Sequence, residues 1–512
     1  MGRLTNETSS LWNYSGPHSV GYQYDAAGRR TKLIYPDGSF VTYAYNANGW
    51  LTNISDGVTN TIVSYEYDNA GRRTKRTLQN STFTVLEYDS ASELSNIWHR
   101  QISGGSTNTI SRYQYGFNDS GNRTWVKRAN GKGDVYKYDA TDQLTNVLYE
   151  ATNPDTTPSA WTNEVSYFFD AAGNRTNVTV AGVGTTTYQP NALNQYTYVD
   201  GVQVLYDANG NLRTNGSGWR LEYDHENKLR YAVSNAYWKE YVYDAFGRLI
   251  GEYPPSGQGR WYCYDGWQLI AEYDNDNNLL VKYVYGPGID EVVRMTRGGT
   301  NYYYHAAALD TVTEITSTNG TVVERYGYDV YGQPTVFDSA FNPQPSTAIG
   351  NRLLFQGRDR DPDTGLYNFR YRYYSPSLGR FVQIDPIKEE GGINLYAYVY
   401  NSPVNYFDAD GLRAGRNVID NTQIVRLPDG SNWTYSPDWS GAQNAGGNSP
   451  PARPILPPGP IRCDDSANGF PTFTAPATVG PTTPPRPPSF EPPIICSTCI
   501  INVPRLISIP RS

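Results

Sequence analysis

The chain has 512 residues and a formal net charge of −8, and it contains 45 Tyr and 48 Gly but only 2 Met. The acidic balance, with basic residues scattered over turns, argues against a general nucleic-acid-binding surface, so no nucleic-acid partner is expected. No run of about 18 apolar residues and no signal peptide occurs, so we expect no membrane span and an export route that this chain does not encode. The Tyr- and Gly-rich composition favours one large repetitive all-β structure over two or three ordinary domains.

One pattern recurs from the start of the chain. It reads YQYDAAGRRT at residues 22–31 and YEYDNAGRRT at residues 65–74, and after Tyr264 it gives way to less regular tyrosine-rich segments. Weaker copies, about 20 residues apart where they are most regular, contain Tyr88-Asp89, Tyr138-Asp139, Phe169-Asp170, Tyr206-Asp207, Tyr223-Asp224, Tyr243-Asp244, Tyr264-Asp265 and Tyr328-Asp329.

Each copy predicts one β-hairpin. Tyr at positions i and i+2 of a strand point to the same face, so Y-x-Y places two rings side by side. The Asp opens a turn, and the Gly three residues later gives the backbone the freedom that the turn needs. Because a lone hairpin is marginally stable, the units must add edge to edge. We therefore predict a spiral antiparallel sheet of YD-repeat hairpins, forming a shell or partial barrel over residues 1–350.

The repeated residues and the isolated ligand-type residues also have chemical interpretations. The tyrosines are interpreted as core and ladder residues in preference to a sugar-binding platform, and the aspartates as turn formers in preference to metal ligands. His305 and Cys263 lack nearby partners of metal-ligand spacing and are interpreted as structural. Cys496 and Cys499 form a lone C-x-x-C, which is a weak zinc signal, so no metal and no cofactor is predicted.

The periodic pattern stops at residues 351–412. Here turn pairs such as Asp361-Pro362 and Asp385-Pro386 separate short aromatic strands, which predicts a module that plugs or closes the sheet. The run from Arg358 through DPDTGLYNFRYRYYSPSLGRF to NLYAYVYNSPVNYFDADGL resembles the RHS repeat-associated core domain of bacterial RHS/YD-repeat proteins. The resemblance implies that this core ends a spiral β-sheet shell. It also implies that the chain is cut just after a closing Asp-Pro-x-Gly-Leu, as in many members, which frees a variable C-terminal polypeptide that is often a toxin.

The resemblance further implies which residues perform this self-cleavage. The family aspartates match Asp385 and Asp408, the cut falls between Leu412 and Arg413, and Arg372 matches a family arginine near the site. Two neighbouring carboxyl groups can hydrolyse a peptide bond when one activates water and the other, protonated, donates to the carbonyl oxygen. An intramolecular aspartyl protease is one hypothesis. The other is that both aspartates only form turns.

The closing motif departs from the family pattern. It reads Asp408-Ala409-Asp410-Gly411-Leu412, so Ala replaces Pro and a second Asp is added. Ala releases the fixed φ of proline, and Asp410 adds a competing charge. Whether self-cleavage survives these changes is left open, and Asp385→Asn or Asp408→Asn is expected to abolish any cut.

Residues 413–512 form the third predicted part, a Pro-rich, mostly irregular tail without His or a phosphate-binding loop. At about 4.8 Å between strands and 3.3 Å per residue, a closed sheet made of residues 1–412 would enclose little more volume than a compact tail needs. We therefore expect this chain to be part of a larger shell or to form an incomplete cage.

The favoured function is an RHS/YD-repeat shell that encloses or presents its own C-terminal segment, secreted or at the cell surface, with a secretion system or an N-terminal shell component as a further partner. The alternative is a structural or adhesive surface protein that binds carbohydrate through its aromatic sheet and is not cleaved.

Overall fold

The computed structural model describes residues 3–9, 18–57, 60–216, 218–235, 237–417, 424–426, 432–434 and 443–444. This part of the chain consists of antiparallel β-strands and four short 3-10 helices. Strands β1–β18 form an 18-stranded sheet and β19–β33 a 15-stranded sheet, in which each strand pairs with its neighbours along the chain. The predicted all-β class and the sheet of consecutive hairpins are confirmed.

The strands of the first sheet are β1 (Asn6–Ser9), β2 (His18–Tyr24), β3 (Arg30–Ile34), β4 (Phe40–Tyr45), β5 (Leu51–Asp56), β6 (Asn60–Tyr67), β7 (Arg73–Leu78), β8 (Thr82–Tyr88), β9 (Leu94–Ser103), β10 (Ser106–Phe117), β11 (Arg123–Arg128), β12 (Lys132–Tyr138), β13 (Leu144–Thr152), β14 (Asn163–Phe169), β15 (Arg175–Val180), β16 (Gly184–Pro190), β17 (Tyr196–Val199) and β18 (Val202–Gln203). Those of the second are β19 (Leu205–Tyr206), β20 (Leu212–Thr214), β21 (Arg220–Tyr223), β22 (Leu229–Val233), β23 (Trp238–Tyr243), β24 (Leu249–Tyr253), β25 (Arg260–Asp265), β26 (Gln268–Tyr273), β27 (Leu279–Tyr285), β28 (Val292–Arg297), β29 (Thr300–Ala306), β30 (Val312–Thr316), β31 (Val322–Tyr328), β32 (Pro334–Phe337) and β33 (Pro343–Gln344). The remaining elements are β34 (Asp359–Arg360), β35 (Tyr367–Phe369), β36 (Arg372–Ser375), β37 (Arg380–Phe381), β38 (Phe407–Asp408), β39 (Ala414–Asn417), β40 (Ile424–Arg426), β41 (Asn432–Thr434), β42 (Gln443–Asn444) and the helices η1 (Ala308–Asp310), η2 (Phe355–Gly357), η3 (Lys388–Gly391) and η4 (Val399–Asn401).

In most repeats the turn is held by the aspartate, whereas Asp265 forms an ion pair with Arg30. In the first unit the N–H of Gly28 donates to the carbonyl of Asp25 at 2.9 Å, and the N–H of Arg29 donates to the carboxylate Oδ1 of Asp25 at 2.8 Å. Gly28 has a φ of 83°, in the left-handed region that glycine adopts most easily. The same side-chain bond recurs between Asp244 and the N–H of Arg248 at 2.9 Å. These aspartates act as turn formers.

The second tyrosine of the Y-x-Y-D pattern ties its unit to the preceding one. The Tyr67 hydroxyl donates to the Leu51 carbonyl at 2.6 Å, and the Tyr88 hydroxyl donates to the Arg73 carbonyl at 2.9 Å. In both cases the acceptor lies two residues after the glycine of the previous turn. Phe would fill the same space but leave that carbonyl without its donor, which is a reason for tyrosine at this position. Equivalent bonds to the preceding unit are made by Tyr45, Tyr138, Tyr223, Tyr243, Tyr264 and Tyr328.

The repeat extends further than the Tyr-Asp pairs indicate. Asn46 accepts the N–H of Trp50 at 3.0 Å through its side-chain Oδ1, so Asn serves as well as Asp in this turn. The prediction that the repeat gives way after Tyr264 is wrong, because Asp274 and Asp338 form the same turn. Each follows an aromatic residue, Tyr273 or Phe337, but Asn277 and Phe341 stand where the pattern has its glycine.

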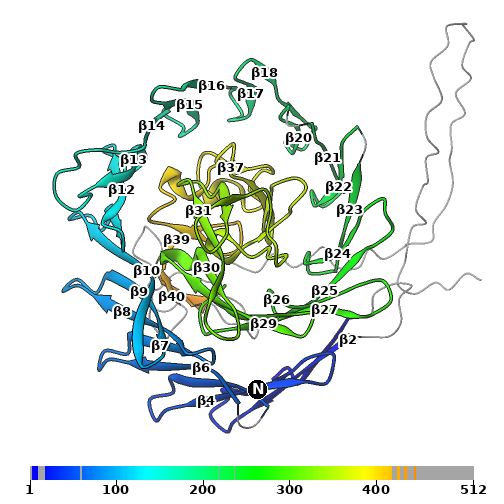
Figure 1. Cartoon of the computed structure of the whole chain (residues 1–512). Coiled ribbons are helices and arrows are strands. Elements are labelled where there is room, and N and C mark those ends of the chain that lie inside the picture. Colours follow the sequence, from blue (N-terminus) through cyan, green and yellow to red (C-terminus); the bar gives the residue numbers. More distant parts are fainter. Residues whose placement is uncertain are drawn as a thin grey trace, which may run out of the picture. The chain divides into compact units, whose positions relative to one another are not determined.

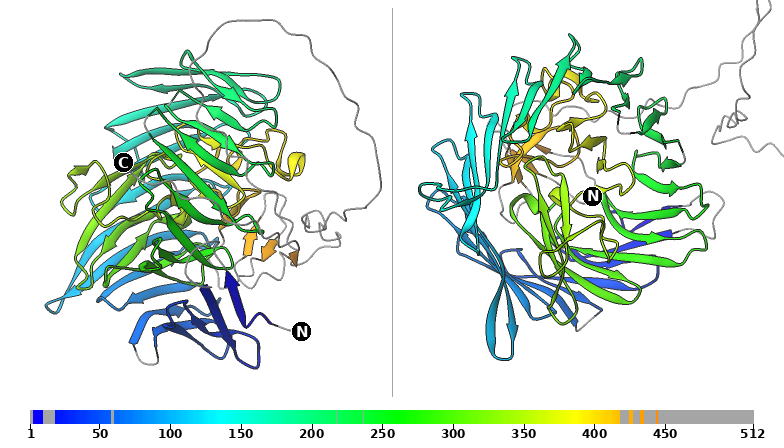
Figure 2. Two further views of the ribbon diagram at one scale, coloured as in Figure 1. Left: turned by 90° about the vertical axis from the view of Figure 1, so that its right-hand side faces the viewer. Right: turned by 45° about the horizontal axis from the view of Figure 1, so that its top comes forward.

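The second sheet returns along the inner side of the first, so that β25–β30 lie beside β2–β9 (Figures 1 and 2). Polar side chains join the two layers. Arg72 pairs with Asp68 of its own turn at 2.7 Å, whereas the next residue, Arg73, pairs with Glu291 of the inner layer at 2.5 Å. Arg30 pairs in the same way with Asp265 at 2.5 Å. The predicted spiral is therefore confirmed, and the second arginine of the G-R-R motif joins its two layers.

Residues 351–412 lie within the arc of strands (Figure 1). A small sheet of β34–β37 contributes three rings to an aromatic cluster that Tyr398 completes, and all four rings are almost fully buried: Phe369, Tyr374, Phe381 and Tyr398. The Tyr374 and Tyr398 ring centroids are 4.2 Å apart. Each aromatic ring buries a large area, so these contacts help to hold the short strands of this module together.

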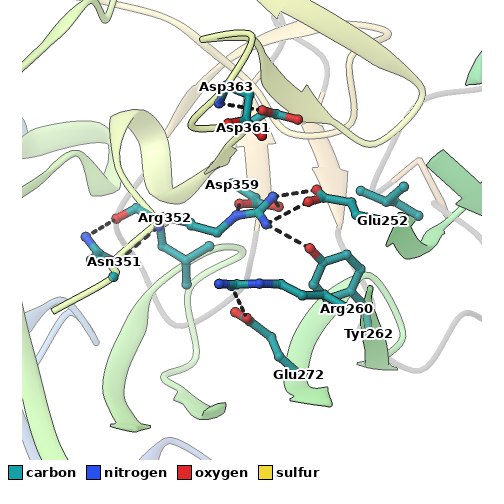
Figure 3. A network of polar contacts seen from close by, with 12 residues as sticks. Glu252, Arg260, Tyr262, Glu272, Asn351, Arg352, Asp359, Asp361 and Asp363 are labelled. Atoms are coloured by element: carbon teal, nitrogen blue, oxygen red, sulfur yellow. Dashed lines mark hydrogen bonds and ion pairs between the residues drawn. The ribbon is translucent and has the colours of Figure 1, made fainter. Parts of the chain in front are cut away.

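An ionic network anchors this module to the second sheet (Figure 3). Arg352 donates to Glu252 of β24 at 2.7 Å, to the Tyr262 hydroxyl at 2.8 Å and to Asp359 at 2.7 Å. The neighbouring Asp361 accepts from Lys239 of β23 at 3.1 Å. Each of these buried charges has an opposite partner, as a buried charge requires.

No helix in the described residues is long and apolar enough to cross a membrane. The division of the chain at residues 350 and 412 stays a prediction. The second sheet ends at Gln344, and β39 pairs with β38 across the second boundary. Most of the predicted irregular tail, including Cys496 and Cys499, lies outside the described residues.

Candidate functional site

The structure brings together the three residues that the sequence nominated for self-cleavage. Nη2 of Arg372 lies 2.9 Å from Oδ2 of Asp385 and 3.7 Å from Oδ2 of Asp408. All three residues are buried, with exposed fractions of 2%, 4% and 2%. Arg372 also donates to the carbonyls of Leu395, at 3.1 Å, and Gly411. One guanidinium thus holds two carboxylates and the backbone of the closing turn.

Asp408 organises the closing turn through its other oxygen. Oδ1 accepts the N–H groups of Gly411 at 2.8 Å, Leu412 at 3.1 Å, and Asp410 and Arg413 at 3.3 Å. The repeat aspartates use Oδ1 in a similar way, so part of this arrangement is ordinary turn chemistry. The difference is that the Arg413 N–H belongs to the peptide bond predicted to be cut.

The predicted scissile bond also lies close to Asp385. A methyl group placed on Gly391 would lie 3.0 Å from Cγ of Asp385 and 3.3 Å from the carbonyl oxygen of Leu412. The Asp385 carboxyl group and the Leu412 carbonyl oxygen therefore border the same small space. The Asp385 carboxyl group thus lies across this space from the oxygen of the Leu412–Arg413 peptide bond, and Asp408 accepts the N–H of that bond.

Burial shifts the ionisation of this cluster. Burial raises the pKa of Asp385 to about 6, because Arg372 only partly offsets the loss of water. Burial and the neighbouring Asp408 raise the pKa of Asp410 to about 7. Burial lowers the pKa of Arg372 although the carboxyl groups of Asp385, Asp408 and Asp410 oppose that shift. Asp385 therefore holds a proton over part of the neutral to mildly acidic range, which a proton donor needs.

The residues that depart from the family motif are accommodated. The Ala409 carbonyl accepts from both Arg358 and Arg370, and Arg370 also pairs with Asp290 at 2.8 Å. Asp410 accepts the Leu412 N–H at 3.0 Å. These arginines were missed from the sequence because their acceptor is a backbone carbonyl, for which no residue type gives a signal.

The other candidate ligand residues do not form a site. His305 is buried and bonds to Thr316 at 3.0 Å, and Cys263 is buried as a free thiol. Within the described ranges no group of three or more His, Cys, Asp or Glu side chains is arranged to hold a metal ion. Tyr22 and Tyr65 of the two strongest repeats are buried at exposed fractions of 5% and 4%, so these rings do not offer a sugar-binding platform.

A spiral of Tyr-Asp hairpins that surrounds an aromatic module with a closing Asp-x-Asp-Gly-Leu turn defines a β-shell protein of the YD-repeat type. A family model described as teneurin YD-shell matches residues 106–404, and one described as RHS repeat matches residues 2–39 and 45–82. Because the first match covers more than half of the chain, the chain belongs to the YD-shell family.

Several relatives have established names. The tRNA nuclease WapA of Bacillus subtilis is 32% identical over 259 residues, which are 48% of this chain and 11% of the relative. The toxin protein Tse5 of Pseudomonas aeruginosa is 25% identical over 346 residues, or 59% of this chain and 25% of that protein. The crystal structure of TcdB2-TccC3 matches with a TM-score of 0.66 at 20% identity, covering 78% of this chain and 22% of the other. The chain thus spans only about a tenth to a quarter of these relatives.

Proposed function

We propose that this chain is the closing part of a toxin-delivery shell, which carries its own C-terminal segment and releases it by cutting the Leu412–Arg413 bond. The toxin and nuclease names of the relatives support the carriage of an active C-terminal segment. The observation that carries the proposal is the position of two carboxyl groups near one peptide bond, with Arg372 within 4 Å of both carboxyl groups.

The reaction follows from these positions. A water molecule attacks the carbonyl carbon of Leu412 and passes a proton to Asp408, while protonated Asp385 gives its proton to the carbonyl oxygen. The C–N bond then breaks as the proton held by Asp408 passes to the Arg413 nitrogen, which lies 3.3 Å from Oδ1, and one hydroxyl of the diol returns a proton to Asp385. The products are a carboxylic acid at Leu412, which then loses its proton to the amine at Arg413 or to solvent, and that amine. Arg372 stabilises the negative charge that the two carboxyl groups share during the step.

Holding the bond within its own site supplies much of the catalytic advantage, because no substrate has to be captured. The same geometry limits the enzyme to a single turnover on its own chain, since the new Leu412 carboxylate remains beside Asp385 and Asp408.

The test is the intact mass of the purified chain and of the Asp385→Asn and Asp408→Asn variants. Wild type is expected to separate into residues 1–412 and 413–512 under denaturing conditions, and both variants should stay whole. A variant that is still cut after Leu412 would exclude its aspartate. Because donation requires protonated Asp385, whose pKa is about 6, the cleavage rate should fall as the pH rises above about 6.

A further inference from the structure

The turn after Asp385 lies against the bond that is proposed to be cut. It begins at Asp385, whose carbonyl accepts the Lys388 N–H at 3.0 Å and whose Oδ1 accepts the Ile387 N–H at 3.0 Å. It continues through η3 (Lys388–Gly391) and ends with the Gly392 N–H on the Glu389 carbonyl at 3.2 Å. The carboxyl group of Asp385 is therefore fixed by the same turn that comes to lie beside it.

The glycines at the end of this turn differ in what they require. Gly392 has a φ of 134°, which favours glycine, but a side chain there would meet nothing within 4 Å. Gly391 has a backbone conformation that any residue can adopt, yet its added Cβ would meet the Asp385 carboxyl group and lie 3.0 Å from its Cγ. The backbone conformation thus favours glycine at position 392, whereas the lack of room for a side chain favours glycine at position 391.

The space beside Gly391 is where proton transfer would occur. The same added Cβ would lie 3.3 Å from the Leu412 carbonyl oxygen. Carbon atoms in contact normally stay about 3.5–4.0 Å apart, so a methyl group would force the Asp385 carboxyl group to move by roughly 0.5–1 Å. Asp385 is held between this turn and Arg372, so that movement would take it away from the carbonyl oxygen, from Arg372 or from both.

Glu390, the residue before Gly391 in this turn, contacts Arg413, which follows the proposed cleavage site. Glu390 lies 3.1 Å from the guanidinium of Arg413, and its side chain is 68% exposed. An exposed ion pair of this kind contributes little, so we expect it to matter far less than the space at Gly391.

We propose that Gly391 is a positioning residue for self-cleavage, because its missing side chain lets the Asp385 carboxyl group approach the Leu412 carbonyl oxygen. This inference rests on the proposed function.

The experiment compares full-length wild type with Gly391→Ala, Gly392→Ala and Glu390→Ala. Each protein is purified under conditions that slow cleavage, and the fraction cut after Leu412 is followed by intact mass over time and across pH. The same substitutions are also made in the Asp408→Asn variant, which is expected to stay uncut. Thermal melting of these proteins reports whether each substitution disturbs the fold.

Gly391→Ala is expected to cleave about 100-fold more slowly, the cost of a displacement near 1 Å, and to shift the pH midpoint of cleavage because Asp385 has moved relative to Arg372. Gly392→Ala strains the same turn without adding atoms at Asp385 and should cleave within about threefold of wild type, as should Glu390→Ala. Melting of Gly391→Ala should match that of Gly392→Ala.

Equal slowing in Gly391→Ala and Gly392→Ala would overturn the inference, because it would trace the effect to the turn as a whole. Cleavage of Gly391→Ala at the wild-type rate would also overturn it and leave the proposed function intact. A wild-type chain that stays uncut at every pH would instead refute the proposed function, and the inference with it.

Discussion

Replacing Arg372 by Gln tests whether one guanidinium holds the site together. The side chain is 2% exposed and lies within 4 Å of both aspartate carboxylates, so its removal leaves them facing each other without a counter-charge. Removing one partner of a buried ion pair costs about 3–5 kcal/mol. For roughly 400 folded residues the unfolding entropy is about 0.8 kcal/mol per degree, so the melting temperature should fall by about 5 °C.

The assay is a double-mutant cycle read by thermal melting, with intact mass recorded so that cut and uncut proteins are compared separately. Arg372→Gln is combined with Asp385→Asn, which removes one of the two carboxylates. If the guanidinium acts through these charges, Arg372→Gln should lower the stability of the Asp385→Asn protein by about half as much as it lowers that of wild type, or less. A loss that is the same in both backgrounds, or an Arg372→Gln protein as stable as wild type, would refute the reasoning.

Three further predictions concern the repeat and the buried titratable groups. Tyr67→Phe keeps the ring but removes the 2.6 Å bond to the Leu51 carbonyl, so urea denaturation should show a loss of about 1 kcal/mol. Burial and Asp408 raise the pKa of Asp410 to about 7, above its unfolded value, so this carboxyl group destabilises the fold increasingly as pH rises from about 4 to 7. Asp410→Asn should therefore melt higher than wild type at pH 8 and lose that advantage near pH 3.5. His99 and His305 are buried with ring centroids 5.0 Å apart, and burial lowers the pKa of both. Since they are protonated in the unfolded chain below about pH 6.5 but neutral in the fold, stability should drop as pH falls below that value. The melting-point difference between wild type and His99→Gln should accordingly shrink from pH 7.5 to pH 5, and a constant difference would contradict this assignment.

The sequence by itself determined the local structure of the repeat. Tyr65 and Tyr67 share one strand face, and Asp68 opens a turn that Gly71 completes, because these features depend on residues within one hairpin. The same reasoning overlooked the unit at Asn46, because it searched for aspartate where the turn needs only a side-chain oxygen acceptor.

The tertiary structure alone decided what lies between units that are far apart along the chain. Arg30 and Asp265 are separated by 235 residues, and no local sequence pattern indicates that they pair. Asp385, Asp408 and Arg372 were nominated together by a family resemblance, but only the folded chain places Asp385 beside the Leu412 carbonyl oxygen and Asp408 beside the Arg413 nitrogen. Gly391 gave no signal at all, because an added side chain would meet both Asp385 of its own turn and the Leu412 carbonyl oxygen, which only the folded chain brings beside that turn.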